Sequence, residues 1–202
     1  MSGKNIKKNN APKVIGIIGT SPGVGVTHFG LMLAVFLTAV KGYRVAMAEQ
    51  NESVCLRQAE IILKNLKNKK TRRIFNKISI FTQTEELTLS QIISMDFDCV
   101  IIDYGCNYEA ARTGFLMCHR KLVVGSLSWW KIRSYVTFLI NTGNESSGGC
   151  WTFLANAPVS EGIHYISREL KIRIIGIPYE PDPFRLGSGS VEFFSKLTDK
   201  LF

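Results

Sequence analysis

Apolar residues gather in short, nearly continuous runs that alternate with longer stretches of helical periodicity. The runs predict strands at 14–19, 44–48, 77–81, 99–102, 121–127, 150–155 and 171–177. The stretches between and after them predict helices at 29–40, 54–66, 87–95, 108–118, 131–140, 162–170 and 191–202. Strands without polar alternation are typical of a parallel sheet that helices cover on both faces. The pattern therefore predicts an α/β protein: a doubly wound, mostly parallel sheet of about seven strands with helices on both faces.

The same pattern indicates a single domain. We find no internal repeat and no linker, so we expect a flexible basic tail at 1–12 and one domain over 13–202. A chain of 202 residues, 46% of them apolar and 20% charged, can bury one large core. The longest apolar run, at 31–40, is about half a membrane span, and the polar start does not resemble a signal peptide. We expect a cytoplasmic protein, with attachment to the periphery of the inner membrane face as an alternative.

The positive charge allows an acidic partner but does not require one. The formal net charge is +9, and much of the excess lies in the tail and in a basic cluster at 64–77. Because aromatic residues are not interleaved with these runs, base stacking has no support, and solvated surfaces are favoured over nucleic acid or anionic lipid. The five cysteines lack metal-ligand spacing.

A glycine-rich turn after the first strand is the most informative element. It reads T-S-P-G-V-G-V-T at 20–27, and a helix follows it. Such a turn directs backbone N–H groups at an anion, and the helix adds the positive end of its dipole. Relative to a full Walker A motif, Gly25 and Thr27 stand at the last glycine and hydroxyl positions, but Val26 stands where the lysine belongs. Taken alone, the segment equally fits a glycine-rich turn of any doubly wound fold.

Later segments shift the balance toward a nucleotide site. The run F-D-C-V-I-I-D-Y-G at 97–105 is an apolar strand ending in Asp103, as in a Walker B strand, although Asp103 could instead cap the turn that follows. The run W-T-F-L-A-N at 151–156 ends in Asn156, which could also be a simple turn residue. The run I-R-I-I-G-I-P-Y at 172–179 leads into a turn at Pro178.

With these segments in this order, the chain resembles the MinD/ParA family of P-loop ATPases from residue 14 to residue 202. The family's deviant loop reads K-G-G-V-G-K-T where this chain has S-P-G-V-G-V-T. The altered loop also resembles that of TadZ/CpaE-like proteins of pilus assembly. The resemblance implies ATP or ADP with Mg²⁺ as cofactor, a protein partner in a larger assembly, and a possible homodimer.

The resemblance also implies roles for individual residues. Thr27 and Asp103 would be the Mg²⁺ ligands, and Asp103 and Glu49 would be the catalytic residues of an active enzyme. The nucleotide-binding residues would be Gly23, Val24, Gly25, Val26, Thr27, His28, Asn156 and Pro178.

The departures from the family loop affect catalysis most. Ser21 and Val26 occupy the two lysine positions, and Pro22 removes one N–H from the loop. A missing lysine at a transferring phosphate raises the barrier by several kcal/mol. The chain is thus expected to be a regulatory, positioning or scaffolding protein with little or no ATP hydrolysis, binding a nucleotide or none. The alternative is a slow ATPase that uses a substitute basic residue, such as Lys13, Lys131 or one from a partner.

Two further features carry alternatives. Trp129 and Trp130 could form a partner-binding edge, but one buried ring and one half-exposed ring are favoured. In the last helix, Val191, Phe194, Leu197 and Leu201 form an apolar stripe that could lie on a membrane. Since the polar face is not enriched in Lys and Arg, packing of this stripe inside the domain is favoured.

Overall fold

The structure is a computed structural model that describes residues 11–53, 55–65, 76–82, 88–146, 149–156 and 160–201. Most of the expected tail at 1–12 and of the basic cluster at 64–77 lies outside the described residues.

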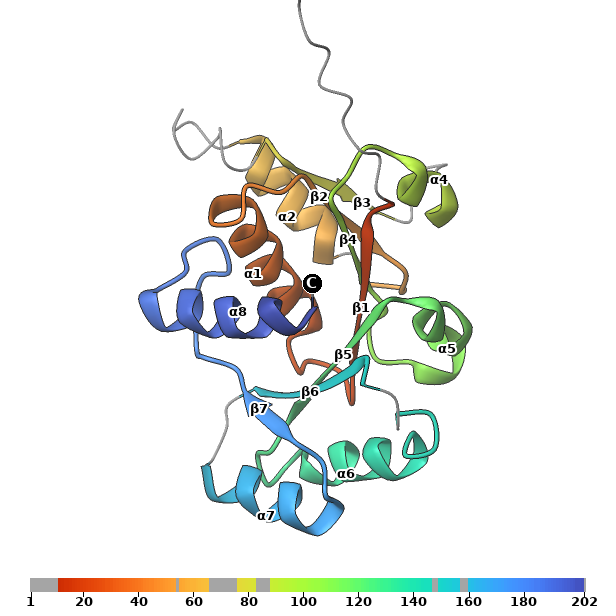
Figure 1. The fold of residues 1–202 in the computed structure, drawn as a ribbon, viewed down its shortest axis with the longest axis vertical. Coiled ribbons are helices and arrows are strands. Elements are labelled where there is room, and N and C mark those ends of the chain that lie inside the picture. The colour runs from red at the N-terminus through yellow and green to blue at the C-terminus, as the bar shows by residue number, and fades with distance from the viewer. Residues whose placement is uncertain are drawn as a thin grey trace, which may run out of the picture.

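One sheet forms the centre of the molecule (Figure 1). Its seven strands lie in the order β3-β2-β4-β1-β5-β6-β7, and every neighbouring pair is parallel. The predicted fold class is therefore confirmed, with a sheet that is wholly parallel. The bounds are β1 Lys13–Gly19, β2 Val45–Glu49, β3 Ile78–Phe81, β4 Cys99–Asp103, β5 Arg120–Ser126, β6 Trp151–Asn156 and β7 Ile174–Gly176.

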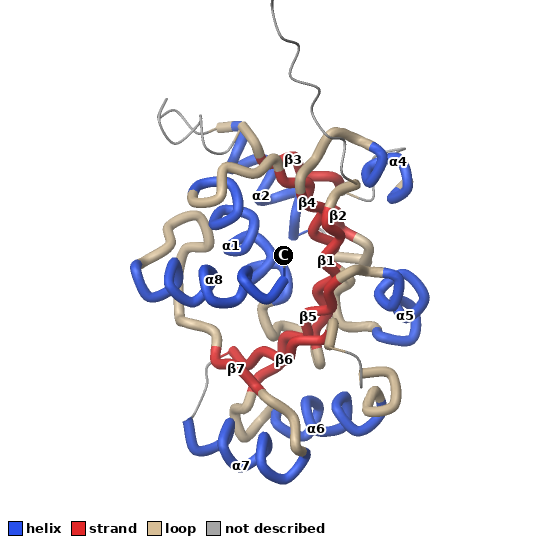
Figure 2. Tube along the Cα trace, viewed as in Figure 1, coloured by secondary structure: helices blue, strands red, loops and turns tan. Residues whose placement is uncertain are grey.

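Helices cover both faces of the sheet, as Figure 2 shows with the strands between two helical layers. One face is covered by α1 (Val26–Ala39), α2 (Cys55–Lys64) and α8 (Ser188–Leu201). The other face is covered by α4 (Leu89–Ser94), α5 (Tyr108–Met117), α6 (Ile132–Asn141) and α7 (Ser160–Leu170). Each predicted helix is present, and the bounds differ from the expected ones by a few residues.

Helix α1 is enclosed by the rest of the domain. Its residues from Phe29 to Thr38 are all buried, because the sheet lies on one side of the helix and α8 on another. The ring of Phe194 in α8 lies 5.5 Å from that of Phe29 and 5.6 Å from that of Phe36. This explains why α1 has almost no polar face.

The expectation that the last helix packs inside the domain is confirmed. Phe194, Leu197 and Leu201 are buried, and Val191 packs against the same core. The apolar stripe is thus occupied by the protein's own core and does not face outward. Within the described residues, the helices are all too short or too polar to cross a bilayer.

Candidate functional site

The candidate site lies at the carboxyl ends of three adjacent strands. Because the sheet is parallel, the segments that follow β1, β2 and β4 meet at one edge. They enclose an open cleft of about 760 Å³. It is lined by the loop at 21–28, residues 50–53 and 55, residues 103–107 and the start of α5.

Two glycines shape the loop after β1. Gly23 (φ 69°) and Gly25 (φ 92°) both have left-handed backbone, which other residues adopt only at a cost. Gly25 is the N-cap of α1, and its carbonyl accepts the N–H of Phe29 at 2.9 Å. The loop therefore presents the free N–H groups at the start of α1 to the cleft, as an anion site requires.

Thr27 and Asp103, which the sequence analysis paired as Mg²⁺ ligands, are in direct contact. The Thr27 hydroxyl donates to Oδ2 of Asp103 at 2.6 Å. The other carboxylate oxygen of Asp103 accepts Nδ2 of Asn51 at 3.0 Å and the N–H of Gly105 at 2.8 Å. Burial raises the pKa of Asp103, although the bonds from Thr27 and Gly105 oppose the shift. The pair provides a hydroxyl and a carboxylate, which are ligands that Mg²⁺ prefers.

Glu49, which the resemblance also names as a catalytic residue, is buried beside the cleft. It is 2% exposed, and Oε1 accepts the hydroxyl of Ser53 at 2.6 Å and, at 3.4 Å, the N–H of Leu56 in the first turn of α2. Burial raises its pKa, and the nearby Asp103 adds to the shift. Among the described residues that line the cleft, Asn51 rather than Glu49 contacts Asp103. Sequence reasoning missed Asn51, and its only signal was a polar residue two positions beyond the strand.

The two lysine positions hold side chains that bring no charge. Val26 is 8% exposed, and its Cγ2 atom would lie 2.8 Å from a Cβ placed on Gly19, so it packs against the end of β1. Ser21 has a buried hydroxyl without a hydrogen-bond partner among the described residues. The described lining contains no Lys or Arg, whereas it includes the carboxyl groups of Glu52 and Asp103. Any lysine or arginine that contacts a bound phosphate would therefore come from outside the described lining.

Of the two lysines named as substitutes, the structure brings one to the loop. Lys13 is the first residue of β1 and lies at the opposite edge of the sheet. Lys131 is the N-cap of α6, and its Nζ atom donates to the carbonyl of Pro22 at 2.7 Å. This contact joins residues 109 positions apart, because β5 lies directly beside β1.

The remaining expected nucleotide-binding residues lie around the loop. Nε2 of His28 donates to the carbonyl of Glu180 at 2.9 Å, which links α1 to the segment after β7. Nδ2 of Asn156 donates to the carbonyl of Val24 at 3.2 Å. Pro178 is partly buried in the segment that reaches His28. Within the described part of the chain, the cleft lining includes His28 but neither Asn156 nor Pro178.

The tryptophan pair differs from the favoured expectation. Trp129 is 94% exposed and Trp130 is 90% exposed, so the expectation of one buried ring was wrong. Both precede α6, and hydrogen bonds from the N–H groups of Lys131 and Ile132 to the carbonyl of Ser128 turn the chain into the helix at this point. Two large rings therefore stand in solvent next to the lysine that contacts the loop.

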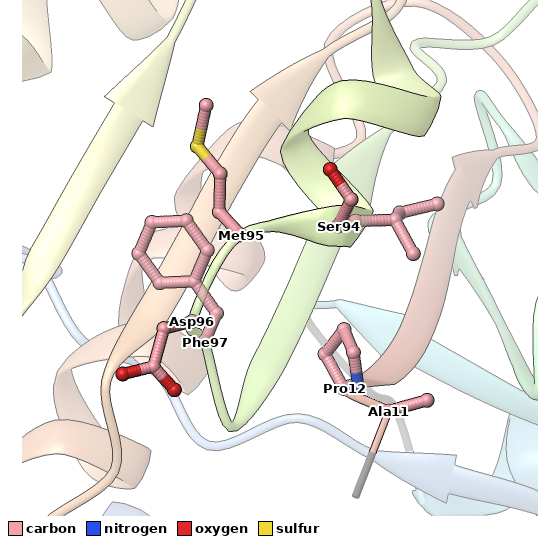
Figure 3. Close-up of a pocket in the computed structure, with 7 residues that line it drawn as sticks. Ala11, Pro12, Ser94, Met95, Asp96 and Phe97 are labelled. Carbon is pink, nitrogen blue, oxygen red and sulfur yellow. The ribbon is translucent and has the colours of Figure 1, made fainter. Parts of the chain in front are cut away.

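A second pocket, of about 290 Å³, lies at the opposite edge of the sheet (Figure 3). It is formed by the start of β1 and the segment between α4 and β4, with Met95, Phe97 and Pro12 as apolar lining. Its carboxylate, Asp96, is in an ion pair with Arg44. Its described lining contains neither a glycine nor the start of a helix, so the cleft at the glycine-rich loop is the better candidate site.

Comparisons with known proteins agree with this geometry at the level of the fold. No protein-family model matches the sequence, and no curated protein matches it. A plasmid partition protein of Borrelia burgdorferi bound to AMPPNP superposes with a TM-score of 0.64 at 12% identity, over 95% of this chain and 98% of that one. MinD in the MinC:MinD cell division complex of Aquifex aeolicus gives 0.63 at 16% identity, over 93% and 96%. FlhF complexed with GTP and Mg²⁺ gives 0.59 at 13% identity, over 94% and 75%.

The fold type follows from these likenesses. The chain has the fold of the ParA/MinD-type P-loop NTPases, over nearly its whole length. The glycine-rich loop, Thr27 and Asp103 stand at the edge of the sheet where this class of fold places its ligands. At these identities the likeness shows the fold, and function has to be argued from the site.

Proposed function

We propose that this chain binds a nucleotide with Mg²⁺ in the glycine-rich loop and acts as a regulatory, positioning or scaffolding protein with little or no ATP hydrolysis. In this proposal it is a pseudo-ATPase of the MinD/ParA type with a degenerate Walker A loop. The bound nucleotide would control the interaction with a partner, and the protein would hydrolyse it slowly or not at all.

The observation that carries the proposal is a contrast between adjacent residues. Thr27 keeps its 2.6 Å contact with the buried Asp103, whereas Val26 has become part of the core. The first feature supports a metal-bound phosphate, since both groups are hard oxygen ligands. The second argues against fast phosphoryl transfer, because position 26 brings no positive charge to the phosphate, where negative charge develops in the transition state.

Different residues of the site would bind the phosphate and the metal. The N–H groups of the loop around Gly23 and Gly25, together with the start of α1, would hold phosphate oxygens. Thr27 and Asp103 would hold Mg²⁺, which neutralises phosphate charge when it is bound. Asn51 would keep the Asp103 carboxylate in place through its 3.0 Å bond.

The buried carboxylate supports a metal in a second way. Asp103 is 1% exposed, and burial raises its pKa, so its ionised form is disfavoured without a cation. Among the described residues, its carboxylate accepts hydrogen bonds from a hydroxyl, an amide and a backbone N–H, none of which carries a full charge. A divalent cation would stabilise the carboxylate where these neutral donors only partly do so.

The proposal is tested by calorimetric titration of the full chain with Mg·ATP and Mg·ADP, combined with a hydrolysis assay. We expect saturable binding of at least one nucleotide and turnover below about one per minute, an order of magnitude typical of slow NTPases. Faster turnover would contradict the pseudo-ATPase part, and lack of any binding would contradict the whole proposal. Val26→Lys should strengthen binding if the loop keeps its shape.

A slow ATPase is the second candidate function, and one observation favours it. Lys131 reaches the carbonyl of Pro22 at 2.7 Å, so a substitute cation is close to the loop. Measurable turnover that disappears in Lys131→Ala would favour this candidate.

Partner binding belongs to the same proposal. Trp129 and Trp130 form an exposed aromatic pair beside the loop, and exposed aromatic residues are enriched at protein interfaces. We therefore favour a protein partner or a second copy of the chain over a membrane surface, since the apolar stripe of α8 is already buried. A cytoplasmic location is part of this proposal.

A further inference from the structure

We infer that Lys131, at the start of α6, supplies the positive charge toward bound phosphate that a loop lysine supplies in a standard Walker A site. The inference rests on the proposed function, which places a polyphosphate in the loop. It identifies a phosphate-binding residue that lies outside the loop and belongs to the segment after β5.

The position of the ammonium group supports this role. Nζ of Lys131 donates to the carbonyl of Pro22 at 2.7 Å and would lie 3.4 Å from a Cβ placed on Gly23. The backbone of Lys131 is fixed, because its N–H donates to Ser128 at 2.9 Å and its carbonyl accepts the N–H of Tyr135 at 3.3 Å. The root of the side chain is therefore held by α6, while the ammonium lies at the rim of the loop.

The charge balance of the cleft requires such a cation. Its described lining includes the carboxyl groups of Glu52 and Asp103 and contains no Lys or Arg. His28 is the basic residue of the described lining, and it directs Nε2 at the carbonyl of Glu180. A polyphosphate would add several negative charges, which Mg²⁺ alone would leave partly uncompensated.

Lys131 can meet this need without a change of fold. An ammonium group has three protons, and the contact with Pro22 uses one of them. A charge-assisted bond to phosphate is stronger than the bond to a neutral carbonyl, so a bound phosphate would attract the ammonium from the rim. The flexible four-carbon stem allows this movement while the backbone stays in α6.

A purely structural role makes a different prediction. If Lys131 only holds the loop through the carbonyl of Pro22, a neutral donor such as Gln would serve nearly as well. If its charge binds phosphate, Gln should fail and Arg should serve. The comparison of Lys131→Gln with Lys131→Arg therefore separates charge from hydrogen bonding.

The experiment titrates the full chain with Mg·ATP, Mg·ADP and inorganic pyrophosphate, for wild type, Lys131→Ala, Lys131→Gln and Lys131→Arg. We expect the Ala and Gln variants to bind about 10- to 100-fold more weakly, and the Arg variant to stay within a few-fold of wild type. The weakened variants should also depend less on salt, because one charge contact is gone.

Lys77 offers a matched control. It too is a lysine whose Nζ atom donates to a backbone carbonyl, that of Gly42 at 3.0 Å, but it lies away from the loop. Lys77→Ala should bind all three ligands as wild type does. Thermal unfolding of each variant without ligand shows whether it is folded.

The outcomes separate the inference from the proposed function. If wild type binds none of the ligands, both are overturned. If wild type binds and the Ala and Gln variants bind equally well, the inference alone fails. Loss of binding in Lys131→Ala with retention in Lys131→Gln would also overturn it. That result would show that Lys131 acts only by holding the loop through its hydrogen bond to Pro22.

Discussion

Carboxylates have opposite surroundings at the two ends of the strands, which we call the amino edge, where the strands begin, and the carboxyl edge, where they end. At the amino edge, Asp96 and Asp98 are partly exposed and lie against the guanidinium of Arg44, whose pKa is raised chiefly by its hydrogen bond with Asp96. At the carboxyl edge, Glu49 and Asp103 are buried, and burial raises the pKa of both. Their hydrogen-bond donors there are hydroxyl, amide and backbone N–H groups.

This difference favours the carboxyl edge as the place where a cation binds. A carboxylate paired with arginine already has its counter-charge, so the amino edge has little to gain from an added cation. A buried carboxylate with neutral donors is less stable in its charged form, and it gains when a cation arrives. At the carboxyl edge, the ammonium group of Lys131 donates to the neutral carbonyl of Pro22 and has no carboxylate partner among the described residues.

The largest expected effect is on metal-dependent binding. Asp103→Ala should weaken the affinity for Mg·ATP about 100-fold, because a proposed metal ligand is removed. Asp98→Ala, at the amino edge, should leave the affinity unchanged. Calorimetric titration with Mg²⁺ and with EDTA measures both. An equal loss for Asp103→Ala in EDTA would indicate a collapsed loop and contradict the metal role.

The next effect concerns two glycines with left-handed backbone, one at each edge. A Cβ on Gly25 (φ 92°) would lie 3.0 Å from Nδ2 of Asn156, whereas the nearest atom to a Cβ on Gly42 (φ 75°) is Nζ of Lys77 at 4.0 Å. We expect Gly25→Ala to lower the free energy of unfolding by about 2–3 kcal/mol and Gly42→Ala by about 1 kcal/mol. Urea unfolding measures both. Equal losses would mean that the loop is no more crowded than an ordinary helix end.

A smaller effect is expected in the pH dependence of stability. Since the folded-state pKa of Glu49 is raised, the folded chain keeps this proton to higher pH than the unfolded chain does. Stability from this group is present at low pH and is lost as pH rises from about 4.3 through the raised pKa. Glu49→Gln removes this loss, so its stability relative to wild type should increase between pH 4 and pH 7.

A substitution at the amino edge should change stability at pH 7 in the opposite direction. Asp96→Asn removes the partner of Arg44 and should lower stability at pH 7 by less than about 1 kcal/mol, as expected for an exposed ion pair. Denaturant titrations across this pH range measure both variants. A decrease in the relative stability of Glu49→Gln with rising pH would contradict the argument from burial.

The smallest effect is expected for the exposed tryptophans. Trp129→Ala and Trp130→Ala should each change the free energy of unfolding by less than about 0.5 kcal/mol, since neither residue is buried. Trp151 begins β6 at the amino edge, and its ring lies 5.3 Å from that of Phe115. Trp151→Ala should therefore cost about 2–3 kcal/mol. A comparable cost for Trp129→Ala would show that its ring packs in solution.

The order and type of the elements could be predicted from the sequence alone. Apolar runs set the seven strands, because a sheet covered on both faces leaves no strand side for water. The resemblance carried by the T-S-P-G-V-G-V-T turn and the strand ending in Asp103 implied a pairing of Thr27 with Asp103, and the two side chains are in contact. The loss of charge at Ser21 and Val26 could also be read directly, since it depends only on residue identity within a local motif.

The residues that surround that motif could not be predicted in this way, because they depend on how the chain folds. The order of the strands brings the start of α6 to the loop, so Lys131 contacts Pro22 and Lys13 does not. The turn after β2 directs Asn51 to Asp103, while Glu49 bonds to the first turn of α2. Strand pairing and the direction of a turn depend on contacts between residues far apart in the chain, and no local pattern of the sequence records them.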